Sequence, residues 1–274
     1  NGENDAGSYE GKKAYMMGSA IYLDPMDKGY HTVNVEDGSM LHGSILSAGA
    51  GAQNIAISNS TMDKGGIYAG SDKSDTNITL TNASVDASQS EIAQNIDTLA
   101  VKLSGYKPFS DINLDAFGDV AIAMYGTKAD SLALDNSTVT GDIGAFNENG
   151  TTLISLTNNS VVNGNVTVDG NAANSVLVDN STVNGEINTS QSTGNSTITL
   201  QNNATVNGDI TTGAGDDTVV LTNDSHVNGN VNGGDGSDTL SMDAGSSISG
   251  QISQFETVNT TSDNSIAIDK INDA

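Results

Sequence analysis

Four aspartates in the C-terminal third of the chain are the residues best suited to bind a metal ion. Residues 233–240 read GGDGSDTL and fit the pattern G-G-x-G-x-D-x-U, and residues 212–219, TGAGDDTV, fit it with threonine as the first residue. Tandem copies of this pattern bind Ca²⁺, which prefers hard oxygen ligands. If the two segments stack, they bring together Asp216, Asp217, Asp235 and Asp238. The alternative is a tight glycine and aspartate turn that needs no ion.

Patterns typical of catalysis are absent from the sequence. The three histidines, His31, His42 and His226, lack metal-ligand spacing, and no G-x-S-x-G nucleophile motif occurs. Paired carboxylates could cleave glycans, but aromatic residues make up only 4% of the chain and basic residues number 9, so sugar-binding platforms are scarce. We therefore expect no enzymatic activity, with glycan cleavage the weakest hypothesis. We expect no cofactor, and calcium is the one ion that the sequence supports.

The elements that position the aspartates belong to an internal repeat. The segment LALDNSTVTGDI at 132–143 returns at 154–166, 176–187, 198–210 and 219–231. One glycine of the repeat stands at intervals of 23, 21, 23, 21 and 21 residues: Gly141, Gly164, Gly185, Gly208, Gly229 and Gly250. A fixed period in this range predicts a solenoid.

Apolar and polar residues alternate inside each repeat. In one copy, Ile198, Leu200, Val206 and Ile210 alternate with polar residues that include Thr199 and Thr205. Period-two alternation places one set inward and the other outward on a β-strand, and runs of three to five residues are too short for helices. The sequence therefore predicts an all-β fold, a parallel β-helix with rungs of about 21–23 residues.

An asparagine precedes the repeated glycine in four rungs: Asn163, Asn184, Asn207 and Asn228. Both residues of an Asn-Gly pair tolerate a positive φ, so we expect this pair to form the turn. Stacked asparagines can also hydrogen-bond through their side-chain amides along the axis. These four asparagines, with the outward Thr199 and Thr205, are our candidate residues for a polar ladder that supports self-association.

The repeat is weaker in the N-terminal half and is lost at residues 87–128. There Ile92, Ile96, Leu99 and Leu103 fall at helical spacing. We expect a protruding loop or short helix that leaves the solenoid; the alternative is one or two degenerate rungs. The segment also holds residue types common at interface hot spots, which we take as a candidate ligand contact: Lys102, Tyr106, Lys107, Phe109 and Phe117.

The net charge excludes several partners. There are 34 acidic residues, 9 lysines and no arginine, which gives −25 at pH 7. Nucleic-acid binding requires clustered cations, so we expect no nucleic-acid partner, and anionic surfaces are disfavoured for the same reason. No apolar run approaches the roughly 20 residues that span a bilayer, and we expect no membrane insertion of this segment. Cysteine is absent, so disulfides are not available.

The N-S/T-x-V-x-G-[DEN]-[IV] rungs, the acidity and the lack of cysteine resemble the passenger domains of bacterial autotransporters, in particular the self-associating AIDA and antigen 43 group. The resemblance implies a right-handed, three-faced β-helix displayed on the outer membrane of a Gram-negative cell or secreted from it. It also implies autoaggregation, biofilm formation or host adhesion, and it carries over no catalytic residues. We expect one domain over 1–274, with 253–274 as a junction region.

Two binding hypotheses follow. In the first, the chain binds copies of itself on neighbouring cells through outward polar ladders, whose weak contacts act by number. In the second, residues 87–128 bind a host surface protein or glycan. The sequence favours the first.

Overall fold

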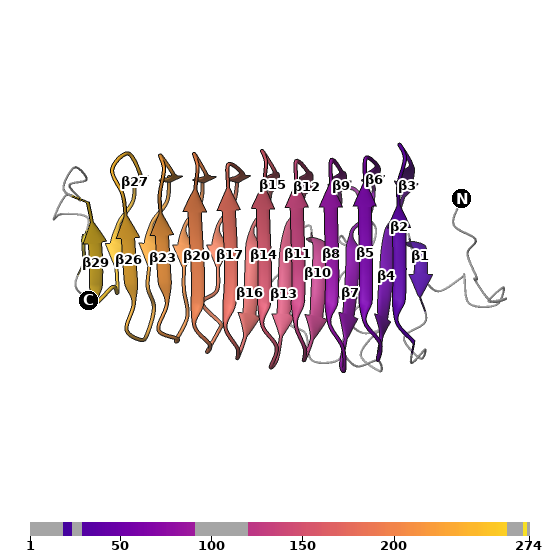
Figure 1. Cartoon of the computed structure of the whole chain (residues 1–274), viewed down its shortest axis with the longest axis horizontal. Helices are drawn as coiled ribbons and strands as arrows, with labels where there is room; N and C mark the ends of the chain where they lie inside the picture. Colours follow the sequence, from indigo (N-terminus) through magenta and orange to yellow (C-terminus); the bar gives the residue numbers. More distant parts are fainter. Residues whose placement is uncertain (1–18, 24–28, 91–119, 262–270, 273–274) are drawn as a thin grey trace.

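The computed structural model describes residues 19–23, 29–90, 120–261 and 271–272. Within these residues the chain contains strands and turns but no helix. The strands form three parallel sheets that run the length of a rod, so that each rung of the solenoid contributes one strand to each sheet in turn (Figure 1). The predicted all-β fold, a parallel solenoid, is therefore confirmed.

We call the three sheets A, B and C. Sheet B has 10 strands, which open each rung: β2 (His31–Val35), β5 (Gln53–Ser58), β8 (Thr76–Thr81), β11 (Asp130–Asp135), β14 (Thr152–Thr157), β17 (Asn174–Asp179), β20 (Ser196–Gln201), β23 (Thr218–Leu221), β26 (Thr239–Met242) and β29 (Thr257–Thr260). Sheet C has 9 short strands that follow them: β3 (Met40–His42), β6 (Thr61–Asp63), β9 (Ser84–Asp86), β12 (Thr138–Thr140), β15 (Val161–Asn163), β18 (Thr182–Val183), β21 (Thr205–Val206), β24 (His226–Val227) and β27 (Ser247–Ile248).

Sheet A has 11 strands that close the rungs: β1 (Ser19–Leu23), β4 (Ser44–Gly49), β7 (Ile67–Ser71), β10 (Val120–Gly126), β13 (Asp142–Asn147), β16 (Val166–Gly170), β19 (Ile187–Asn188), β22 (Ile210–Thr211), β25 (Val231–Asn232), β28 (Ile252–Ser253) and β30 (Ile271–Asn272). A strand of sheet A leads back to the next strand of sheet B, and we call this the A–B corner. The turn from sheet B to sheet C is the B–C corner.

The inward residues of the three sheets stack in columns that fill the rod. Ile154, Val176 and Ile198 are in register on successive rungs of sheet B. The four inward residues predicted for one rung, Ile198, Leu200, Val206 and Ile210, are all 0% exposed. Stacking like on like therefore produces one continuous aliphatic core, which no single rung could bury alone.

Most residues with a left-handed backbone lie at the B–C corner, and none belongs to the four Asn-Gly pairs. They are mostly asparagines that follow the sheet B strands, such as Asn136 (φ 45°), Asn180 (φ 46°) and Asn202 (φ 57°). The turn that we predicted at Asn163-Gly164 and its equivalents is therefore wrong in this respect, because neither residue of those four pairs has a positive φ. Asparagine suits the B–C corner because it tolerates the left-handed region better than other residues with a side chain.

The repeated glycines are required for close approach between rungs. A Cβ on Gly164 would lie 2.4 Å from the carbonyl oxygen of Gly141, and one on Gly185 would lie 2.5 Å from that of Gly164. These distances are too short for a real contact, and the obstructing atoms are backbone. At these two positions glycine is therefore required by stacking, whereas Gly141, the first of the column, also has a positive φ of 120°.

The predicted excursion at 87–128 is shorter than the sequence indicated. Residues Val120–Gly126 form β10, every residue of which is buried, and β10 pairs with β7 and β13 in sheet A. Ile78 pairs with Leu132, 54 positions on, whereas Leu132 pairs with Ile154, 22 positions on. One rung therefore carries an insertion, and its residues 91–119, including the four at helical spacing, lie outside the described residues.

The predicted junction region at 253–274 begins with strands that still belong to the solenoid. β29 pairs with β26 in sheet B, and β30 pairs with β28 in sheet A. In sheet B the last offset shortens, since Leu240 pairs with Val258, 18 positions on.

Candidate functional site

A ladder of side-chain amides runs along the end of sheet C. The amide of Asn184 donates to Oδ1 of Asn163, that of Asn207 to Asn184, and that of Asn228 to Asn207, each at 2.7 Å. The structure therefore contains the ladder predicted from the repeat. Each interior amide donates to one neighbour and accepts from the other.

The same column continues toward the N-terminus with different residues. Asn163 is in register with Thr140, which is followed by Asp86, Asp63 and His42. Nδ1 of His42 lies 2.5 Å from Oδ1 of Asp63. The amide ladder thus occupies only the C-terminal half of the rod, and acidic residues take its place in the other half.

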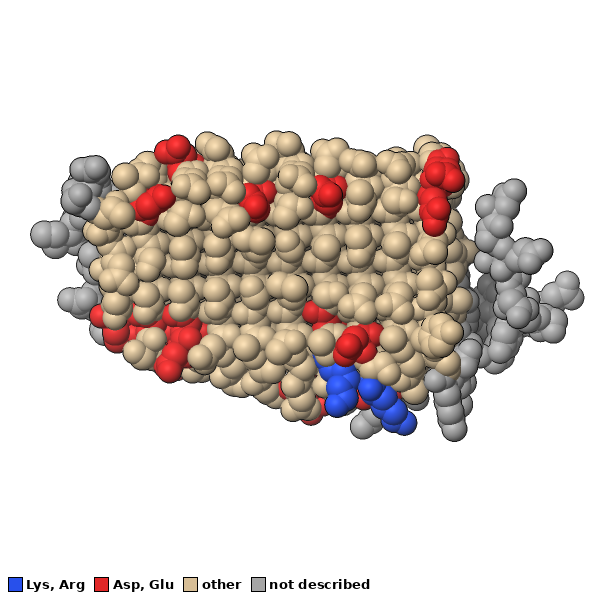
Figure 2. Space-filling view, in the orientation of Figure 1, with Lys and Arg blue, Asp and Glu red and all other residues tan. Residues whose placement is uncertain are grey.

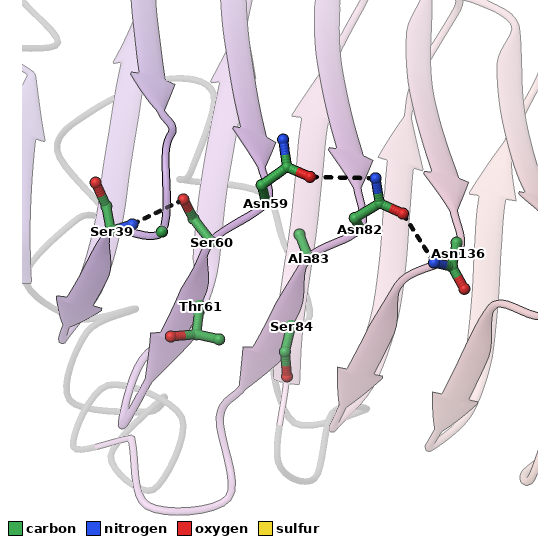
Figure 3. Close-up of a pocket in the computed structure, with 9 residues that line it drawn as sticks. Ser39, Asn59, Ser60, Thr61, Asn82, Ala83, Ser84 and Asn136 are labelled. Atoms are coloured by element: carbon green, nitrogen blue, oxygen red, sulfur yellow. Dashed lines mark hydrogen bonds between the residues drawn. The ribbon is translucent and has the colours of Figure 1, made fainter.

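A second amide ladder runs along the B–C corner, where sequence reasoning did not place one. Asn82 donates to Asn59 at 3.2 Å and Asn136 donates to Asn82 at 2.8 Å, and the three asparagines are among the residues that line an open groove of about 390 Å³ (Figure 3). Its signal in the sequence is the asparagine that directly follows six of the sheet B strands, from β5 to β20. Because these asparagines also hold the left-handed turn, they have a structural role.

The glycine and aspartate turns bring the four candidate calcium ligands onto neighbouring rungs but use them differently. Asp217 accepts hydrogen bonds from the backbone N–H of Ser196 at 2.5 Å and of Gly213 at 3.0 Å. Asp238 accepts from the N–H of Asp217 at 2.8 Å, and Glu256 accepts from the N–H of Asp238 at 2.6 Å. These two buried carboxylates therefore cap backbone N–H groups of the neighbouring rung.

The other two aspartates differ from this buried pair in their exposure. Asp216 accepts from the N–H of Ser237 at 3.0 Å and, like Asp235, is exposed, whereas Asp217 and Asp238 are buried. Among the described residues, no three His, Asp or Glu side chains converge as metal ligands. The geometry favours the turn that needs no ion, and calcium binding by these residues stays a prediction.

Burial affects the protonation of the capping carboxyls. It raises the pKa of Asp238 to about 6, an effect opposed by the N–H of Asp217 and reinforced by the carboxyls of Asp217, Glu256 and Asp216. Burial also raises the pKa of Asp217, although hydrogen bonds from Ser196, Thr212 and Gly213 oppose it. Ionisation of Asp217 and Asp238 therefore costs more free energy than ionisation of an exposed aspartate.

The outward face of sheet B carries a long surface without charge. Two outward columns cross all 10 strands. The first is Thr32, Asn54, Asn77, Ser131, Leu153, Ser175, Thr197, Thr218, Thr239 and Thr257. The second is Asn34, Ala56, Thr79, Ala133, Ser155, Leu177, Thr199, Val220, Ser241 and Asn259.

None of these 20 residues is ionisable, and none is buried. Figure 2 looks onto this face: its central rows contain neither acidic nor basic residues, and the acidic residues lie along its two margins. Leu153, 50% exposed, lies near the middle. With strands about 4.8 Å apart, the two columns extend for about 43 Å. We call this surface the B face.

The candidate ladder residues are divided between surfaces. Thr199 lies in the B face, whereas Thr205 lies on the outer side of sheet C in register with Thr182 and His226. Sequence reasoning missed the B face as a unit, although its signal was present. In each sheet B strand, the residue before the first inward apolar residue and the residue after it are never charged. The candidate ligand contacts Lys102, Tyr106, Lys107, Phe109 and Phe117 lie outside the described residues.

Comparisons with known proteins do not assign this chain to a family, so the fold is the basis for proposing a function. No family model matches the chain, and no curated protein or solved structure matches it with significance. No helix in the described part of the chain is long and apolar enough to cross a membrane. The architecture, a parallel β-solenoid, is consistent with the passenger domains that the repeat resembles.

Proposed function

We propose that this chain is a passenger-type adhesin of the AIDA and antigen 43 kind, and that it promotes association between the cells that display it by binding a second copy of itself. The observation that carries the proposal is the B face, a flat surface without charge on a chain whose net charge is −25. Two copies of so acidic a rod repel one another in most orientations. Contact through the B faces minimises that repulsion.

Charge and distance both support this choice of surface. When two B faces meet, the acidic residues remain at the margins, where solvent and salt screen them over about 8 Å at physiological ionic strength. The face offers hydroxyl and amide groups with a few apolar residues such as Leu153, Leu177 and Val220. Each exposed hydrogen bond contributes about 0.5–1.5 kcal/mol, so the strength of adhesion comes from repetition along the rod and from many rods per cell.

The test introduces charge into the B face. In the double variant Leu153→Glu/Thr199→Glu, we expect loss of autoaggregation by cells that display the chain, and a purified chain that stays monomeric in sedimentation. The matched control is Thr138→Glu/Thr205→Glu, which adds the same charge to the outer side of sheet C. Autoaggregation that survives in the first variant and is lost in the control would exclude the B face as the contact surface.

Binding of a host protein or glycan through residues 87–128 is the alternative from the sequence. Its candidate contacts lie outside the described residues, and it stays a prediction.

A further inference from the structure

Four Asn-Gly pairs in the same local sequence occupy one column of the rod. Each pair follows a buried valine of sheet C, and all four asparagines are exposed: Asn163-Gly164, Asn184-Gly185, Asn207-Gly208 and Asn228-Gly229. A chain can react with itself at such a pair, because glycine has no side chain to keep its backbone nitrogen away from the asparagine amide. Since the preceding residue and the exposure are the same, the sequence gives no reason for one pair to react before another.

The reaction at an Asn-Gly pair is deamidation, and water is its only co-reactant. The backbone nitrogen of the glycine forms a bond to Cγ of the asparagine, and the side-chain nitrogen leaves as ammonia with the proton of the glycine N–H. Water then opens the cyclic imide at either carbonyl, which yields aspartate or isoaspartate. Two groups must move for the first step: the side-chain amide must leave its hydrogen bonds, and the glycine nitrogen must turn toward it.

In the two interior pairs of the ladder, both of these groups are held by hydrogen bonds. The side-chain amide of Asn207 donates to Asn184 and accepts from Asn228, each at 2.7 Å. The N–H of Gly208 donates to the carbonyl oxygen of Gly185 at 3.0 Å. The preceding pair is held in the same way at its side chain and at its glycine. Three hydrogen bonds therefore oppose the reaction at each interior pair.

The pair at the C-terminal end of the ladder has one such bond. Asn228 donates to Asn207 at 2.7 Å, but its Oδ1 accepts a hydrogen bond from no described residue. The next rung has Ser249 in this column, so the series of amides ends at Asn228. The N–H of Gly229 also donates to no described residue. The nitrogen that attacks is thus free to turn, and a single bond holds the side chain.

The pair at the N-terminal end of the ladder lies between these two cases. Asn163 accepts from Asn184 at 2.7 Å, and its amide lies 3.5 Å from the hydroxyl of Thr140, which is long for a hydrogen bond. The N–H of Gly164 donates to no described residue. Asn163 therefore shares the free glycine nitrogen with Asn228, but its side chain has a partner on both sides.

We propose that Asn228 is a site of spontaneous modification, and that it deamidates before the other three asparagines of the ladder. Conversion replaces an amide that donates to Asn207 by a carboxylate that cannot donate. The outer side of sheet C gains a negative charge, and Asn207 becomes the end of a shorter ladder. The amides are then lost in order from the C-terminal end of the rod. This modification does not depend on the B face or on self-association.

The test follows the four pairs by peptide mapping and mass spectrometry while the folded chain is kept in mildly alkaline buffer. We expect Asn228 to convert about tenfold faster than Asn184 and Asn207, where two further hydrogen bonds must break. In urea, which unfolds the rod, the four rates should become alike. Equal rates in the folded chain would overturn the proposal. So would an intact Asn228 after the time in which the unfolded chain has reacted.

A longer ladder provides a second test. Ser249→Asn, at an exposed position, places an amide next to Asn228 on the following rung and should slow its deamidation several-fold. Ser249→Ala changes the same position without adding an amide and should leave the rate unchanged. If Ser249→Asn leaves it unchanged as well, the ladder does not protect its members, and the proposal fails.

The order of loss is tested by a variant that imitates the product. Asn228→Asp removes the donor to Asn207 and should speed the deamidation of Asn207 several-fold, with the rate at Asn163 unchanged. An unchanged rate at Asn207 would show that the amides are not lost in order.

Discussion

The side-chain amide of Asn184 donates a hydrogen bond to Oδ1 of Asn163 at 2.7 Å and in turn accepts one from Asn207 at the same distance. The three residues are separated by 21 and 23 positions but lie on successive rungs. Each rung of the solenoid therefore presents its neighbour with a partner of the same chemistry. This relation explains why an asparagine recurs at that position in four consecutive repeats.

Replacement of Asn184 tests the contribution of the ladder. Asn184→Ala removes the donor to Asn163 and the acceptor for Asn207, so we expect the free energy of unfolding to fall by about 1–2 kcal/mol. Urea denaturation followed by circular dichroism measures it. Asn149→Ala, which alters an exposed asparagine outside the ladder, should leave the denaturation midpoint unchanged. Equal effects of the two substitutions would show that the ladder contributes nothing.

Gly208 separates close packing from turn conformation. A Cβ at this position would lie 2.7 Å from the backbone nitrogen of Glu186, and the residue has no positive φ. We expect Gly208→Ala and Gly208→Asn to lower the free energy of unfolding alike, by about 1–3 kcal/mol. At Gly38, where φ is 73° and no atom lies within 4 Å of a Cβ, Asn should be tolerated better than Ala. A Gly208→Asn variant as stable as the unmodified chain would contradict the packing argument.

Asn180 tests the turn at the B–C corner. Its φ of 46° is unfavourable for most side chains, so Asn180→Ala should cost about 1–2 kcal/mol in the free energy of unfolding. Asn180→Gly should cost less, because glycine adopts this backbone conformation freely and the hydrogen bond from Asn180 to Asn159 is long, at 3.4 Å. Thermal unfolding ranks the two variants, and the reverse order would argue against a conformational role.

The pH dependence of stability should reflect Asp238. Its folded pKa of about 6 lies above the ordinary value of 3.8, so the folded state binds the proton more tightly than the unfolded state does. The stabilisation by protonation is complete below pH 3.8 and is lost as the pH rises to about 6. The wild-type free energy of unfolding should fall across this interval, by at most about 3 kcal/mol from this group.

Asp238→Asn should reduce that fall, because asparagine does not titrate but can still accept the hydrogen bond from Asp217. Urea denaturation at pH 4, 5, 6 and 7 in EDTA measures the slope. Asp235→Asn, at an exposed position on the same turn, should retain the wild-type slope. If Asp238→Asn retains it as well, protonation of this carboxyl does not control stability.

The solenoid was predictable because its determinants are local and repeated. The period of the glycines and the alternation of residues such as Ile198, Thr199 and Leu200 specify a rung and its inward side. Each rung contacts only its neighbours, so a single repeat contains nearly all the information about packing. The amide ladder at Asn163 followed for the same reason, since identical positions on successive rungs must be adjacent.

What the sequence could not decide depends on which positions meet across the rod. The repeat motif alone does not show that Asn180 has a positive φ or that Gly208 makes a close contact between rungs. Only the backbone path assigns these roles. The insertion hid the strand Val120–Gly126, because the rung that contains it spans 54 positions where the next spans 22, so the period is lost, although sheet A still has a strand there. Likewise, Thr76, Asp130 and Thr152 are far apart in the chain, and only stacking brings them into register.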